Sequence, residues 1–111
     1  MRRGEIYWAN LDPTLGSEIR KTRPCLVVSN NVNNELAGTV TVLPITTSIS
    51  RIYPFEVSLP SGTFGLKEPS KAKANQIRTI SKERLGSQIG AVDQEVMKAV
   101  EKAILVHLEM T

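Results

Sequence analysis

Helical periodicity occurs in only one part of this sequence, its C-terminal end, and this restricts the folds that are open to the chain. Apolar residues recur at every fourth position from Val92 to Leu108, which places them on one face of a helix. Asp93 stands where a helix N-cap is expected. His107 flanks the apolar face, so we interpret it as a packed side chain rather than a catalytic base. We expect a single terminal helix.

Most of the remaining chain consists of short apolar or alternating runs that end in turn residues. Such runs predict strands at 4–10, 25–29, 39–45, 55–59, 74–80 and 88–92. The asparagine cluster at 30–34 predicts a turn, and 81–85 predicts a short helix. This pattern indicates a mainly β fold, a small, strongly bent antiparallel barrel closed by the terminal helix. A length of 111 residues fits one domain, 1–111.

Composition excludes several kinds of site. One cysteine and one histidine exclude an internal disulfide framework, the usual structural zinc sites and any mechanism with two histidines in one chain. Acidic residues are scattered singly, so we predict no metal site and no cofactor. Cys25 lies inside an apolar run, which predicts an inert core thiol. No leader and no membrane-spanning stretch is expected, which predicts a cytoplasmic protein without a membrane partner.

The net charge of +3 is unevenly distributed along the chain. Segments 1–30 and 67–84 are basic, whereas 85–111 is acidic. If the two basic segments meet in the fold, they form a surface suited to phosphate. Lys71, Lys73 and Arg78 extend this track.

Two polar groups flank strand ends in the predicted fold. Arg23 precedes Pro24, which holds its backbone extended and presents its guanidinium at a strand entrance. Thr46, Thr47 and Ser48 place hydroxyl groups at a strand exit. Arginine and hydroxyl side chains together can hold a phosphate. The residues alone leave two alternatives open: a structural ion pair for Arg23, and ordinary turn chemistry for the hydroxyls.

A series of sequence blocks, in order and covering nearly the whole chain, resembles the MazF/PemK family of toxin endoribonucleases. The blocks are RGEIYWANLDP at 3–13, GSE at 16–18, RPCLVVSN at 23–30, LPITT at 43–47, YPFEV at 53–57 and QIRTI at 76–80. The resemblance implies an SH3-like barrel of the CcdB/MazF kind with a C-terminal helix, and a homodimer. It also implies sequence-specific, metal-independent cleavage of single-stranded RNA, chiefly mRNA. The products would be 2′,3′-cyclic phosphate and 5′-hydroxyl ends, and a cognate antitoxin protein would block the activity.

The same resemblance implies roles for individual residues. Arg23 and Thr46 match the catalytic arginine and threonine, Glu18 matches a residue implicated in activity or RNA contact, and Gln76 matches an RNA-contacting glutamine. The exposed loops and basic segments add further RNA-binding candidates: Ser17, Arg20, Lys21, Thr47, Ser48, Arg51 and Arg78. Glu18 and a water molecule are both candidates for the general base, since arginine stays protonated.

The sequence departs from the family pattern in the loop before Arg23. Ile19 replaces the usual glutamine, and Arg20-Lys21-Thr22 replaces a glycine-containing stretch. The added charge favours binding to an RNA backbone. Two alternatives remain besides the nuclease. One is a non-enzymatic toxin of the same fold that inhibits DNA gyrase, and the other is a barrel that binds nucleic acid without cutting it.

Overall fold

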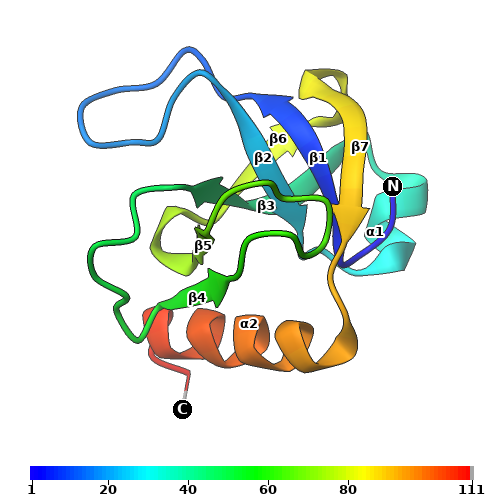
Figure 1. Ribbon diagram of the computed structural model, residues 1–111. Helices are drawn as coiled ribbons and strands as arrows, with labels where there is room; N and C mark the ends of the chain where they lie inside the picture. The colour runs from blue at the N-terminus through cyan, green and yellow to red at the C-terminus, as the bar shows by residue number, and fades with distance from the viewer. Residues whose placement is uncertain (111) are drawn as a thin grey trace.

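A bent antiparallel sheet of seven strands, with one long helix against it, forms the protein (Figure 1). The computed structural model describes residues 1–110. The strands are β1 (Glu5–Asn10), β2 (Thr22–Val27), β3 (Thr39–Thr46), β4 (Glu56–Leu59), β5 (Ser70–Lys73), β6 (Arg78–Ser81) and β7 (Leu85–Ala91). The helices are α1 (Asn31–Leu36) and α2 (Gln94–His107), with short 3-10 turns η1 (Ala74–Gln76) and η2 (Lys82–Arg84).

Strand order in the sheet is β4-β5-β3-β2-β1-β7, and β6 lies beside β3. The sheet bends around its own core without closing, because no pairing joins β4 to β7 among the described strands. The mainly β, barrel-like prediction is confirmed, with the correction that the sheet is open. Among residues 1–110, no helix combines the length and apolar character needed to cross a membrane.

Helix α2 forms where the apolar periodicity predicts it. The Asp93 carboxylate accepts a hydrogen bond from the Val96 N–H at 2.9 Å, so the predicted N-cap is present. Met97, Val100 and Ala103 are buried against the sheet, and α2 packs on β4 and η1. His107 is exposed, with its ring tilted against Phe55 at a centroid distance of 6.3 Å, so its predicted packing is only partial.

The alternating direction of side chains along β2 and β3 divides the interior into two apolar clusters. Leu26 and Leu43 belong to the cluster that contains the buried face of α2. Cys25, Val27 and Val42 belong to the second cluster, on the other face of the same strands. Successive side chains of a strand point to opposite faces, so the continuous apolar runs serve both clusters.

The predicted strand at 74–80 is wrong in its bounds, because the structure contains a break there. Strand β5 pairs with the end of β3 (Ile45↔Ala72), whereas β6 pairs with its beginning (Val40↔Ile80). The turn η1 lies between them and contains three residues that pair with neither register. This inserted turn displaces Gln76 from the strand path.

The predicted turn at 30–34 is also wrong, because these residues begin helix α1. The Asn30 side chain caps the helix by accepting a hydrogen bond from the Asn33 N–H at 2.8 Å. Asn34 is buried, and its amide donates to the Ser29 carbonyl at 2.8 Å. Asparagine favours both turns and N-caps, so composition alone did not separate the two structures. The predicted helix at 81–85 is present as η2, capped by Ser81.

Candidate active site

Strand register brings two of the three predicted catalytic residues, Arg23 and Thr46, to the same end of the sheet. Strands β2 and β3 pair Cys25 with Pro44 and Val27 with Val42. Extended by two residues, this antiparallel register sets Arg23 opposite Thr46 on the same face of the sheet. Directly opposed side chains in such a pair have Cβ atoms roughly 5 Å apart. Arg23 and Thr46 therefore lie on one face of the sheet, at the end where β2 begins and β3 ends.

Arg23 is held from one side only. Its Nε donates to the Arg20 carbonyl at 3.0 Å, and the residue is half-buried. This bond orients the planar guanidinium and leaves its terminal nitrogens as the part available to a ligand. A guanidinium fixed in this way can donate two parallel hydrogen bonds to phosphate oxygens.

Thr46 presents its hydroxyl at the same position. It is half-buried, and its Oγ1 accepts a hydrogen bond from the Ser48 N–H at 3.2 Å. The hydroxyl proton remains free to donate, because this bond uses only a lone pair. On the other side of Thr46, the register places Lys71 of β5 directly opposite.

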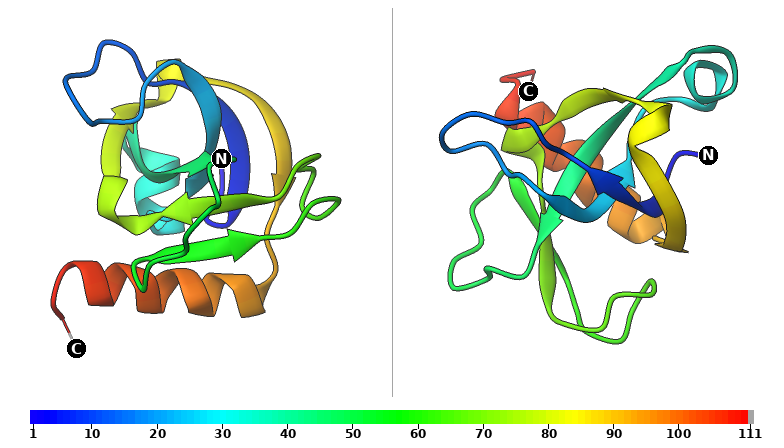
Figure 2. Two further views of the ribbon diagram at one scale, coloured as in Figure 1. Left: turned by 60° about the vertical axis from the view of Figure 1, so that its left-hand side comes forward. Right: turned by 90° about the horizontal axis from the view of Figure 1, so that it is seen from above.

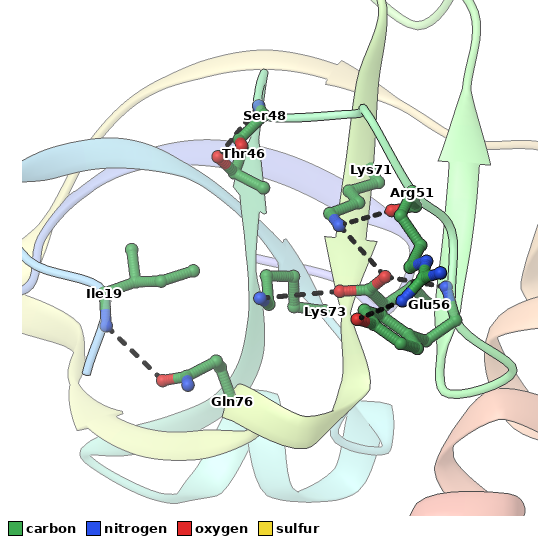
Figure 3. A network of polar contacts seen from close by, with 9 residues as sticks. Ile19, Thr46, Ser48, Arg51, Glu56, Lys71, Lys73 and Gln76 are labelled. Carbon is green, nitrogen blue, oxygen red and sulfur yellow. Dashed lines mark hydrogen bonds and ion pairs between the residues drawn. The ribbon is translucent and has the colours of Figure 1, made fainter. Parts of the chain in front are cut away.

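A buried ionic cluster of Glu56, Lys71 and Lys73 adjoins Thr46 (Figure 3). Lys71 Nζ donates to Glu56 Oε1 at 3.0 Å and to the Arg51 carbonyl at 2.8 Å. Lys73 Nζ lies 3.4 Å from Glu56 Oε2, which makes no hydrogen bond among the described residues. The exposed fractions of the side chains are 1% for Glu56, 8% for Lys71 and 23% for Lys73.

The cluster carries one more positive than negative charge, and the more exposed cation is Lys73. Burial by itself raises the pKa of the Glu56 carboxyl. The Tyr53 N–H and the ammonium groups of Lys71 and Lys73 outweigh burial, so this pKa lies below its ordinary value. Lys71, predicted to extend a phosphate track, instead lies in the buried pair. In Figure 3 the Lys73 ammonium extends between Thr46 and Gln76.

Sequence reasoning missed Glu56. The available signal was periodicity, because Glu56 and Ser58 alternate with apolar residues, and Lys71 and Lys73 are likewise two residues apart. Such spacing puts charges of neighbouring strands on one face. The pairing Glu56↔Lys73 then brings opposite charges together, and no local pattern reports that pairing.

The loop at 11–21 reaches the site through Gln76 and Arg78. Gln76 Oε1 accepts a hydrogen bond from the Ile19 N–H at 3.4 Å, and Arg78 donates to the Leu11 carbonyl at 3.4 Å. The turn η1 and the strand β6 therefore each hold the loop through one hydrogen bond. In Figure 1 and in the left view of Figure 2 this loop and α2 lie at opposite ends of the molecule.

Glu18, the third predicted catalytic residue, and the remaining predicted RNA-binding residues lie at the surface of loops. Glu18 is exposed, and its carboxylate accepts a hydrogen bond from the Leu15 N–H at 2.9 Å. Arg51 is also exposed and donates to the Tyr53 hydroxyl at 3.3 Å. The rest are exposed: Ser17, Arg20, Lys21, Thr47 and Ser48.

Cys25 is fully buried, as predicted. Burial raises the pKa of its thiol to about 12, although Arg78 and Arg23 act in the opposite direction. The thiol is therefore protonated at neutral pH and is no nucleophile. Residues 1–110 contain no group of three or more histidine, cysteine, aspartate or glutamate side chains placed to hold a metal ion.

A family model described as "PemK-like, MazF-like toxin of type II toxin-antitoxin system" matches residues 2–108. The chain belongs to this family. It is similar to endoribonuclease MazF9 of Mycobacterium tuberculosis, with 44% identity over 99% of this chain and 98% of the relative. It is also similar to endoribonuclease EndoA of Bacillus subtilis, with 35% identity over 99% and 96%.

Solved structures of the PemK/MazF-like family share the fold of this chain. MazF from Deinococcus radiodurans has a TM-score of 0.86 at 28% identity, covering 99% of this chain and 97% of that one. An endoribonuclease in complex with its cognate antitoxin, from a mycobacterial species, has a TM-score of 0.83 at 26% identity, covering 100% and 97%. The family resemblance read from the sequence is thus confirmed.

Proposed function

We propose that this chain is an endoribonuclease toxin that cuts single-stranded RNA at a short sequence without a metal ion. The observation that carries the proposal is the position of Arg23 opposite Thr46, with the excess positive charge of Lys73 beside them. The two relatives described above, at 44% and 35% identity, are named endoribonucleases. The position of the charges suits the trigonal-bipyramidal phosphorus of an RNA transesterification, where negative charge increases.

The reaction proceeds by attack of the ribose 2′-oxygen on the adjacent phosphorus. The 2′-O–P bond forms while the P–O5′ bond breaks, which leaves a 2′,3′-cyclic phosphate and a 5′-hydroxyl. The 2′-hydroxyl proton passes to Glu18 or to a water molecule, and the 5′-oxygen takes up a proton from solvent water as it leaves. Arg23, which stays protonated, stabilises the charge on the non-bridging oxygens, and Thr46 donates a hydrogen bond to one of them.

The working unit is a homodimer that a cognate antitoxin neutralises. An antitoxin is present in the mycobacterial structure that shares this fold. Helix α1 exposes Val32 and Leu36, one helical turn apart, with 69% and 78% of their surface accessible. Exposed apolar residues at this spacing support contact with another protein surface.

Incubating the purified chain with a complex RNA pool in a metal chelator tests the proposal. We expect cleavage at one short sequence, and fragments whose 5′-hydroxyl and cyclic-phosphate ends are recovered by end-specific ligation. Sequencing those ends maps the recognition site. Intact RNA after incubation with folded protein would overturn the proposal, and gyrase inhibition by the same sample would then favour the non-enzymatic alternative.

Thr46→Val is expected to lower kcat on the order of 10²-fold, because valine keeps the shape and loses the hydrogen-bond donor. Thr46→Ser keeps the donor and is expected to retain most of the activity. Single-turnover cleavage of an RNA oligonucleotide carrying the mapped site measures both. Equal rates for the valine and serine variants would show that the hydroxyl is not used.

A further inference from the structure

A cavity of about 430 Å³ lies on the opposite face of β2 and β3 from Arg23 and Thr46. Trp8, Pro24 and Thr47 line one side of it, and the β4–β5 loop and β7 line the other. Trp8 pairs with Pro24 in the sheet register and is 43% exposed, so part of its indole is open to a ligand. A larger cavity, of about 670 Å³, contains none of the predicted site residues.

The cavity and the candidate active site lie on opposite faces of the same strand ends. Pro24 directly follows Arg23, and Thr47 directly follows Thr46, so each pair of residues is adjacent in the chain. Successive side chains point to opposite faces, while their Cα atoms are only about 3.8 Å apart. A nucleotide chain with its phosphate at Arg23 and Thr46 can therefore place a neighbouring base in the cavity by crossing the end of β2 and β3.

Two glycines hold the far wall of the cavity in place. A Cβ on Gly65 would lie 2.2 Å from the Ile89 carbonyl oxygen, and a Cβ on Gly90 would lie 2.1 Å from that of Phe64. Gly65 also has a φ of +83°, a conformation that other residues rarely adopt. The β4–β5 loop therefore packs backbone against backbone on β7. This wall is therefore already ordered before a ligand binds, so binding loses little conformational entropy there.

We infer that this cavity binds one unpaired base of the RNA, stacked on Trp8, next to the phosphate that is cut. The inference rests on the proposed endoribonuclease function. Unpaired bases are recognised by stacking on aromatic side chains and by hydrogen bonds to their edges. The cavity offers both, because Thr47, Glu68 and Gln88 add polar groups around the indole.

Charge favours a base over an acidic peptide side chain as the occupant. Lys67 and Glu68 both line the cavity, so their opposite charges balance and the lining suits an uncharged base better than a carboxylate. The Glu68 carboxylate can accept a hydrogen bond from an exocyclic amino group of such a base. The Gln88 amide nitrogen already donates to Glu5 and to the Gly90 carbonyl, which leaves its oxygen as a further acceptor. These two acceptors suit the amino groups that adenine, cytosine and guanine present.

Fluorescence tests occupancy directly, because Trp8 is the only tryptophan of the chain. The probe is a single-stranded RNA oligonucleotide with the mapped site and a 2′-deoxy nucleotide at the cut, which removes the attacking hydroxyl. We expect Trp8 emission to change and to saturate together with binding measured by anisotropy of an end label. Saturated binding with unchanged emission would overturn the inference.

Variants at Trp8 separate this inference from the proposed function. We expect Trp8→Leu to lower kcat/KM roughly 5- to 150-fold, the range for loss of one base stack. Discrimination among the four bases should disappear at one position flanking the cut and persist at the others. Trp8→Phe keeps an aromatic face and is expected to retain that discrimination.

Three further results would overturn the inference. If wild type cuts RNA and Trp8→Leu keeps every base preference, the cavity is not a base site while the nuclease assignment stands. If Trp8→Leu cuts normally but resists the antitoxin, the cavity binds a protein segment. If the wild-type chain cuts no RNA, the proposed function fails and this inference fails with it.

Discussion

Arg23→Ala is expected to lower kcat/KM for RNA cleavage at least about 10³-fold, the effect typical of an arginine that stabilises charge on a transferring phosphoryl group. The side chain is half-buried and anchored through Nε, so its guanidinium is already oriented before RNA binds. Alanine removes the charge and both free donors. Single-turnover cleavage of an oligonucleotide with the mapped site measures the loss.

Controls separate catalysis from folding in this experiment. Lys98→Ala removes one positive charge from the exposed surface of α2 and is expected to cleave normally. Arg23→Lys keeps the positive charge but lacks the planar guanidinium with its paired donors. We expect its cleavage rate to lie between those of Arg23→Ala and wild type. Thermal unfolding and sedimentation should match wild type for all three variants. Cleavage at the wild-type rate by folded Arg23→Ala would refute the proposed mechanism.

Glu56→Ala is expected to lower the free energy of unfolding by about 3–5 kcal/mol, because it leaves the buried Lys71 ammonium without its counter-ion. Glu56 is almost fully buried and accepts hydrogen bonds from Lys71 and from the Tyr53 N–H. Urea denaturation followed by circular dichroism measures the change. The matched control is Glu35→Ala, an exposed carboxylate on α1, for which we expect a change below about 0.5 kcal/mol.

The stability from Glu56 depends on pH in a predictable direction. Its pKa is lower in the folded chain than the ordinary value of 4.5, so the folded state favours the carboxylate. The contribution is therefore complete above the unfolded pKa and is lost as pH falls through the lower folded value. As pH falls below 5, the free energy of unfolding should decrease more for wild type than for Glu56→Ala. Parallel pH profiles for the two proteins would contradict the buried pair.

Local patterns predicted most of the secondary structure. The terminal helix and the strands at 4–10, 39–45 and 55–59 follow from periodicity, which depends on neighbours within a few residues. The error at 74–80 occurred where distant strand partners decide the conformation, whereas the error at 30–34 arose because asparagine favours both turns and N-caps. Residues 74–80 contain β-forming side chains, but β3 pairs with β5 and β6 in different registers and forces the turn η1 between them.

The sequence by itself determined the residue types of the site: an arginine fixed before a proline, hydroxyls after a strand, and basic segments around them. Only the tertiary structure decided which of these groups meet. The β2–β3 register puts Arg23 and Thr46 on one face at the same end of the sheet. The β4–β5 pairing buries Glu56 between two lysines, and β7 packs against the loop that lies beside Trp8. Periodicity fixes the face on which a side chain lies, whereas its neighbours across strands depend on non-local pairing.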